Sequence, residues 1–205
     1  MPIILVRHGE SESNVGEMTG GWTDTPLTAL GLRQAEAVAR RLEAELGGQS
    51  CRLVSSDLRR AMQTAEAIGE ALGVKPSPEP GLREIYNGEA TGKTKAEAKA
   101  IYTPPTRPLI EWVAYPGAEN WLQLNRRVSS TMDRLYKDPV ENLVLVAHGG
   151  SLHHVLFWWL RLPSTIIDDI NFRLDNACLS RLSISPLEQR LVEKLNDTSH
   201  LEGLG

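Results

Sequence analysis

The segment Ile3-Ile4-Leu5-Val6-Arg7-His8-Gly9-Glu10 places a short apolar run directly before a group of polar residues. A second run, Leu143-Val144-Leu145-Val146-Ala147, leads in the same way into His148-Gly149-Gly150. Continuous apolar runs of this length are typical of strands that helices cover on both faces. The two segments therefore predict a buried sheet with a histidine directly after each of two strands.

Helices are expected between these strands. Residues 28–46 carry one apolar stripe, with Thr28 as a candidate N-cap and Gly47-Gly48 as the stop. The stripe consists of Leu32, Ala35, Val38, Ala39, Leu42 and Leu46. Residues 57–72 repeat the pattern after a third apolar run at 52–55, and further helices are expected at about 119–136 and 151–161. Alternating segments at 178–184 and 190–195 predict terminal strands, so the expected fold is a three-layer α/β/α sandwich with a mostly parallel central sheet.

The stretch from about 87 to 117 breaks this alternation with Pro104-Pro105, Pro108 and Pro116. We interpret it as an excursion from the sheet that covers the substrate pocket. A chain of 205 residues is long enough for one substantial α/β core. We therefore predict a single domain over residues 1–205.

The composition of the chain argues against several kinds of site and partner. Cys51 and Cys178 lie far apart, so neither a disulfide framework nor a thiolate metal cluster is predicted. A net charge of −4 argues against general nucleic-acid binding. No segment approaches the roughly 20 apolar residues that span a bilayer, and Met1-Pro2 opens no signal peptide. We expect a cytoplasmic protein with no nucleic-acid and no membrane partner.

Catalytic groups of open α/β sheets gather beyond the carboxyl ends of the strands. Four segments are expected there: Arg7-His8-Gly9-Glu10, Ser55-Ser56-Asp57 with Arg59-Arg60, Leu82-Arg83-Glu84, and Ala147-His148-Gly149-Gly150. Two histidines in the same position after a strand, each followed by glycine, indicate a shared site, because glycine lets a ligand approach the backbone.

These residues resemble the histidine phosphatase superfamily, also called the phosphoglycerate mutase-like family, over nearly the whole chain. Besides those segments, the resemblance includes Asn14, Gly21-Trp22, Met62-Gln63-Thr64-Ala65 and Pro116-Gly117-Ala118-Glu119. It implies that His8 is the nucleophile, that Arg7, Arg60 and His148 form a phosphate pocket, and that Glu84 is the proton donor. It further implies substrate contacts at four positions: Asn14, Gly21, Glu119 and Gly149. Motif register selects Arg60 over Arg59 and Glu84 over Glu89.

The chemistry is consistent with these roles. Adjacent guanidinium groups disfavour imidazolium and keep His8 nucleophilic, and we expect a backbone carbonyl to hold its other nitrogen. Phosphoryl transfer spreads charge over three oxygens, which Arg7, Arg60, Asn14 and His148 can stabilise without a metal ion. We therefore predict no metal and no cofactor. Glu84 would protonate the leaving group and then accept a proton from water.

The predicted activity is that of a histidine acid-type phosphatase acting on a small phosphorylated metabolite. Alternatives are a cofactor-dependent phosphoglycerate mutase and, less favoured, a non-catalytic binding module. Residues 84–118 balance four basic against four acidic residues, whereas mutases of the family carry a longer insertion with a basic cluster. Side chains expected to pack on a sugar or aromatic group are Tyr86, Asn87, Tyr102, Trp112 and Tyr115, with Lys93 or Arg107 binding a carboxylate or second phosphate.

The helix after His148 is rich in apolar and aromatic residues. Of His153 and His154, one is expected to line the pocket and the other to pack in the core. Trp158-Trp159 belongs either to the core or to a subunit contact, so a homodimer is compatible with the sequence.

Overall fold

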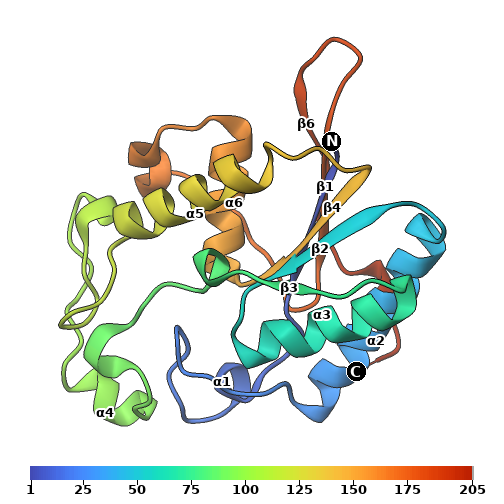
Figure 1. Ribbon diagram of the computed structural model, residues 1–205. Helices are drawn as coiled ribbons and strands as arrows, with labels where there is room; N and C mark the ends of the chain where they lie inside the picture. Colours follow the sequence, from blue (N-terminus) through green and yellow to red (C-terminus); the bar gives the residue numbers. More distant parts are fainter. Residues whose placement is uncertain (205) are drawn as a thin grey trace.

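The computed structural model describes residues 1–204 and is built on one six-stranded sheet, in the order β3-β2-β4-β1-β5-β6 (Figure 1). The strands are β1 (Ile3–Arg7), β2 (Cys51–Ser55), β3 (Ser77–Pro78), β4 (Asn142–Ala147), β5 (Leu179–Ile184) and β6 (Arg190–Asp197). The pairs among β3, β2, β4 and β1 are parallel, whereas β5 and β6 add an antiparallel hairpin at one edge. The mostly parallel sheet and the two terminal strands are confirmed.

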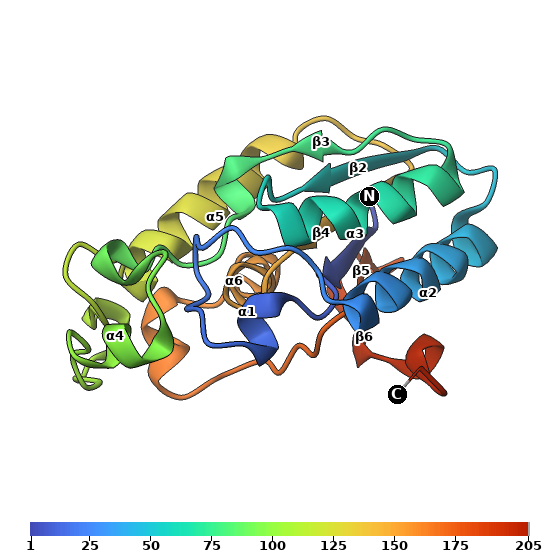
Figure 2. The same cartoon turned by 90° about the horizontal axis from the view of Figure 1, so that it is seen from below.

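Helices cover both faces of this sheet, as Figures 1 and 2 show. The helices are α1 (Glu12–Val15), α2 (Ala29–Leu46), α3 (Arg59–Leu72), α4 (Lys95–Lys99), α5 (Trp121–Leu135) and α6 (Gly149–Leu160). The pair α2 and α3 packs on one face, and the pair α5 and α6 packs on the other. The predicted three layers are thus present.

Alternating strand residues supply the two cores, because successive side chains of a strand point to opposite faces. Ile3 and Leu5 of β1 belong to the core under α5 and α6. Ile4 and Val6 belong to the core under α2 and α3. Both sets are at most 2% exposed, which explains why the strands appear in the sequence as uninterrupted apolar runs.

Helix α2 begins at the predicted cap, since the Thr28 side chain accepts a hydrogen bond from the Gly31 amide at 3.0 Å. Most of its predicted stripe is buried. Leu32 was wrongly placed on that stripe, because it lies in the first turn of the helix and is 46% exposed. The core contact of α2 therefore starts at Ala35, one turn later.

The excursion at 87–117 contains α4. Three short 3₁₀ segments lie in the connection from β3 to α5. The 3₁₀ segments are Pro80–Leu82, Gly88–Ala90 and Leu109–Glu111. In Figure 1 this green segment extends away from the sheet on the side where α5 begins. Within residues 1–204, the helices are all too short or too polar to cross a membrane.

Candidate active site

Strand register brings the two strand-end histidines together. Arg7 of β1 pairs with Ala147 of β4, so the next residues, His8 and His148, leave the sheet side by side. Neighbouring strands lie about 4.8 Å apart, and the two imidazole rings have centroids 5.0 Å apart in an edge-to-face arrangement. The site is therefore a direct consequence of parallel pairing between two similar segments.

One nitrogen of His8 is fixed by the backbone. Its Nδ1 lies 2.7 Å from the carbonyl oxygen of Gly9, which can only accept, so Nδ1 carries the proton. Nε2 therefore presents a lone pair, and it accepts a hydrogen bond from Nε of Arg60 at 3.3 Å. Burial, then Arg60, then Arg7 hold the pKa of His8 well below its usual value of 6.5. His8 is thus a neutral imidazole with an available Nε2.

Arg60 is buried against His8, with 2% of its surface exposed, whereas Arg59 is exposed. Two carbonyl oxygens orient its guanidinium: Gly21 accepts from Nη2 at 2.7 Å and Thr23 accepts from Nη1 at 2.9 Å. Gly21 has a φ of +63°, and a Cβ there would lie 2.8 Å from the Ile85 carbonyl. Gly21 therefore contributes its backbone, which only glycine fits at this point.

Two further predicted phosphate donors lie near His8. Arg7 donates from Nη1 to the Leu174 carbonyl at 2.5 Å, while its buried Nε has no acceptor within residues 1–204. The Asn14 oxygen accepts from the backbone amide and hydroxyl of Ser11, both at 2.9 Å, and from Asn176 at 3.1 Å. Because these contacts occupy the oxygen, the Asn14 amide nitrogen remains to donate.

His148 is completely buried at the start of α6. Its Nε2 shares a 2.8 Å hydrogen bond with the hydroxyl of Ser56, the first residue after β2. Burial, followed by Arg60 and His8, lowers the pKa of His148 well below 6.5. Its neighbour Gly149 starts the helix, and a Cβ there would lie 3.8 Å from Nε of Arg7. The amino end of α6 thus faces the guanidinium of Arg7, a favourable setting for an anion.

Glu84 is held against the same helix end. One carboxylate oxygen accepts from the Gly150 amide at 3.0 Å, and the other accepts from the Ile85 amide at 2.9 Å. A Cβ on Gly150 would lie 2.2 Å from that second oxygen, so the carboxylate occupies the space that the missing side chain leaves. Glu89, the alternative candidate, is exposed. The structure thus brings Glu84, not Glu89, to α6.

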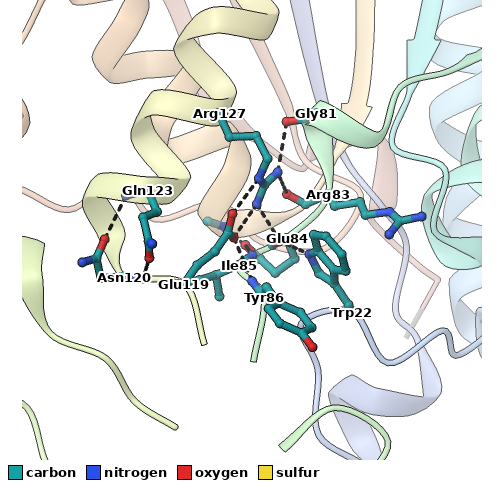
Figure 3. A network of polar contacts seen from close by, with 11 residues as sticks. Trp22, Gly81, Arg83, Glu84, Ile85, Tyr86, Glu119, Asn120, Gln123 and Arg127 are labelled. Atoms are coloured by element: carbon teal, nitrogen blue, oxygen red, sulfur yellow. Dashed lines mark hydrogen bonds and ion pairs between the residues drawn. The ribbon is translucent and has the colours of Figure 1, made fainter. Parts of the chain in front are cut away.

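A partly buried ion pair secures the backbone around Glu84 (Figure 3). The Arg127 guanidinium donates to both oxygens of Glu119, at 2.9 and 2.7 Å. It also donates to the carbonyls of Gly81, Arg83 and Glu84, at 3.1, 2.9 and 3.0 Å. One Glu119 oxygen accepts from the Tyr86 amide at 2.9 Å as well. The predicted substrate contact Glu119 therefore directs its carboxylate at Arg127 and at the chain that carries Glu84.

Trp22 reinforces this arrangement from the other side, as Figure 3 shows. Its indole nitrogen donates to the Glu84 carbonyl at 2.7 Å, and the Arg83 guanidinium lies 4.6 Å from its ring centroid. Arg83 in turn binds both carboxylate oxygens of Asp57, at 2.7 and 2.5 Å. The position of Glu84 is thus tied to the segments that follow β1 and β2.

Sequence reasoning missed three residues that organise the site: Ser56 as the partner of His148, Arg127, and Asn176. The Asn176 side chain donates to the carbonyls of His8 and Gly9, at 3.1 and 3.3 Å, in addition to Asn14. Ser56 lay in a segment that the strand pattern had marked. Arg127 on a helix and Asn176 in a turn give no periodic signal, since the backbone carbonyls that they bind lie 43 to 168 residues away.

A cavity of about 560 Å³ opens from this end of α6. It is lined by Gly149 and Gly150, by Leu109 and Trp112 of the excursion, by Trp121 and His153, and by residues 167–174. Among the five aromatic or polar side chains expected to contact substrate, Trp112 lies on its wall. Arg107 pairs instead with Asp168, and Lys93 is exposed and does not line this cavity. The connection from α6 to β5, which drew no prediction, forms much of the cavity.

The two histidines of α6 differ as predicted. His153 lines the cavity, whereas His154 is fully buried beside Asn125 and Trp121. Within residues 1–204, His, Cys, Asp and Glu side chains form no group of three suited to a metal.

A model of the histidine phosphatase superfamily (branch 1) matches residues 3–198. A probable phosphoglycerate mutase of Yersinia enterocolitica is 32% identical over 98% of this chain and 95% of its own length. A protein of the same name from Yersinia pestis is 31% identical over the same shares. Nearly the whole chain therefore aligns with these relatives.

Solved structures also align with nearly the whole chain. A mycobacterial glucosyl-3-phosphoglycerate phosphatase in complex with VO3 has a TM-score of 0.81 at 30% identity, covering 96% of this chain and 99% of that one. The α-ribazole phosphatase of Shigella flexneri has a TM-score of 0.82 at 24% identity, covering 96% of each chain, and at this identity it shows the fold alone.

Proposed function

This chain belongs to the histidine phosphatase superfamily, and we propose that it hydrolyses small phosphomonoesters through a phosphohistidine on His8. The observation that carries the proposal is the state of the His8 imidazole. Gly9 fixes the proton on Nδ1, and Nε2 directs its lone pair at Arg60. A phosphoryl group bound beside the Arg60 guanidinium would be within reach of that lone pair.

The first step forms a P–N bond and breaks the P–O bond of the ester. Nε2 of His8 attacks phosphorus while Glu84, entering as the carboxylic acid, gives its proton to the departing alkoxide. Arg7, Arg60, the Asn14 amide nitrogen and the Gly149 N–H at the start of α6 donate to the equatorial oxygens, where negative charge is spread. The free alcohol then leaves.

The second step reverses these roles. Glu84, now a carboxylate, accepts a proton from a water molecule as the water oxygen attacks phosphorus. The P–N bond breaks, its electron pair returns to Nε2, and inorganic phosphate is released. Glu84 is again the acid and His8 again neutral, so the cycle balances without a further reactant.

Mutase activity is the second candidate, because the Yersinia relatives bear that name. A mutase returns the phosphoryl group from histidine to another hydroxyl of the same compound and must exclude water. The absence of a longer insertion does not distinguish this chain from those relatives, since the alignment covers 95% of their length. Hydrolysis is favoured instead because the cavity wall carries few cations that could hold a second phosphate. Arg173 lies on this wall, but its side chain is 84% exposed.

The test combines trapping with turnover. Brief exposure to a ³²P-labelled phosphomonoester should label the protein with an acid-labile, base-stable phosphate that His8→Ala does not acquire. EDTA should leave turnover unchanged. Phosphate release from 3-phosphoglycerate should exceed formation of 2-phosphoglycerate, with 2,3-bisphosphoglycerate present as primer. Faster isomerisation than release would make the chain a mutase, and labelling of His8→Ala would disprove the nucleophile.

Arg60 and Arg59 offer a matched pair of variants. Arg60→Ala removes a buried guanidinium that contacts His8, whereas Arg59→Ala removes its exposed neighbour on the same helix. Removal of one preorganised donor costs on the order of 10²-fold in kcat or more. We expect that loss for Arg60→Ala and less than about threefold for Arg59→Ala.

A further inference from the structure

The cavity beside Glu84 is where the leaving group of a phosphomonoester would lie. Two of its lining residues contact the site directly: the Gly150 amide binds Glu84, and the Leu174 carbonyl binds Arg7. A phosphoryl group bound between His8 and Arg7 would lie next to the end of the cavity that Gly149 and Gly150 form. A volume of about 560 Å³ lies within the range of small-molecule sites.

Aromatic and aliphatic side chains dominate the walls of this cavity. Trp112, Trp121 and Phe172 are aromatic, and they are joined by four aliphatic residues: Leu109, Ile167, Ile170 and Leu174. Half-buried indole and phenyl groups of this kind bind flat rings and the apolar faces of sugars. The wall is thus suited to a ring-bearing group rather than to a short, fully hydrated chain.

Charges on the wall are few and mostly engaged. Asp168 accepts from the Leu109 amide at 2.6 Å and pairs with Arg107 at 3.4 Å. Asp169 is exposed at the rim, and Arg173 pairs with Asp175 at 3.0 Å. A carboxylate on the leaving group would face two acidic side chains and one already paired cation. Like charges this close disfavour each other.

His153 supplies a neutral donor instead. Its Nδ1 accepts from the Phe172 amide at 3.2 Å, which leaves the proton on Nε2. Burial lowers the pKa of His153 to about 4, so the ring is uncharged near neutral pH. An uncharged N–H on a cavity wall is suited to a hydroxyl or carbonyl oxygen of the ligand.

We propose that this cavity selects phosphomonoesters of uncharged, ring-bearing alcohols and discriminates against leaving groups that carry a carboxylate. The inference rests on the proposed phosphatase function. It assigns specificity to the wall built by Trp112, Trp121 and residues 167–174, separately from the residues that react with phosphorus.

Three substrates with alkyl leaving groups test it: benzyl phosphate, 4-carboxybenzyl phosphate and ethyl phosphate. We expect kcat/KM for benzyl phosphate to exceed that for each of the other two by about tenfold or more. Equal or faster hydrolysis of the carboxylated ester, or of ethyl phosphate, overturns the inference while the phosphatase proposal stands. If none releases phosphate, the phosphatase proposal fails, and calorimetric binding of benzylphosphonate against 4-carboxybenzylphosphonate still decides the selectivity of the cavity.

Charge reversal at the rim gives a gain-of-function test. Asp169→Lys places a cation beside the cavity and should raise kcat/KM for 4-carboxybenzyl phosphate relative to benzyl phosphate by about fivefold or more. Glu66→Lys makes the same charge change on α3, on the other face of the sheet, and should leave the ratio unchanged. An unchanged ratio in Asp169→Lys, or an equal rise in both variants, would contradict an electrostatic origin in the cavity.

Discussion

Arg127→Lys tests whether the partly buried ion pair with Glu119 positions the proposed acid. The Arg127 guanidinium makes five hydrogen bonds, two to Glu119 and three to the carbonyls around Glu84. A lysine has three donors, so at least two bonds are lost. With charge-assisted bonds worth about 1.5 kcal/mol or more, the folded state should lose about 3 kcal/mol. For a chain of this length, Tm should fall by about 6–12 °C.

Activity distinguishes positioning from stability. An alkyl phosphate needs a proton on its leaving oxygen, whereas 4-nitrophenolate leaves without one. At a temperature well below the variant's Tm, kcat/KM for ethyl phosphate should fall by about 10- to 100-fold, because a general acid contributes 10²–10⁴. The value for 4-nitrophenyl phosphate should fall by less than about threefold, because kcat/KM reports the steps up to phosphorylation of His8.

The same exchange at Arg126 is the control, because Arg126 is the exposed neighbour on α5. Arg126→Lys should change neither Tm nor the ratio between the two substrates. Equal losses of activity on both substrates in Arg127→Lys would mean that Arg127 holds the fold but does not place Glu84. A lower Tm with unchanged activity on both would lead to the same conclusion.

Three other outcomes are expected. Gly150→Ala puts a Cβ 2.2 Å from a Glu84 oxygen and should lower kcat/KM for ethyl phosphate far more than Gly149→Ala, whose Cβ meets nothing closer than 3.8 Å; equal losses would argue against displacement of Glu84. Because the pKa of His8 is held well below 6.5, kcat/KM should not decline between pH 7 and pH 6, and a midpoint near 6.5 in a pH profile would contradict this. Burial lowers the pKa of His153 to about 4 and of His154 to about 3, so the unfolded chain binds more protons below pH 6.5. Stability is therefore lost as pH falls, by about 1.4 kcal/mol per unit for each histidine, and urea unfolding that is unchanged between pH 7.5 and pH 5.5 would refute it.

The fold was predictable in those segments whose burial produces a recognisable hydrophobic pattern in the sequence. β1 and β4 are covered on both faces, so their residues form uninterrupted apolar runs. The first turn of α2 was misassigned because hydrophobic spacing alone does not show where a helix meets the sheet. Leu32 has the right spacing, yet it lies beyond the edge of the core.

The residues of the candidate site likewise fall into two groups, those that the sequence pattern predicts and those that it does not. His8 and His148 each follow a buried strand, so their proximity follows from strand pairing alone. Arg127 and Asn176 bind backbone carbonyls from distant segments, and such contacts depend on the folded path of the chain. In the sequence, Arg127 has the same appearance as Arg126, which is exposed. Neither pattern nor spacing separates the two.

The sheet constrains the residues around His8 more strongly than it constrains the cavity wall. The residues proposed to react with phosphorus lie at the end of β1 or in the segments directly after β1, β2 and β4, so the sheet fixes their positions. The cavity wall comes from the excursion at 87–117 and from residues 167–174, two connections whose sequence the sheet does not constrain. A relative can therefore share the reaction with phosphorus and differ in its leaving group. The 32% identity to a probable mutase thus bears on the chemistry at His8 more than on the compound, and exchange of residues 167–174 between such relatives should transfer substrate preference while leaving phosphorylation of His8 intact.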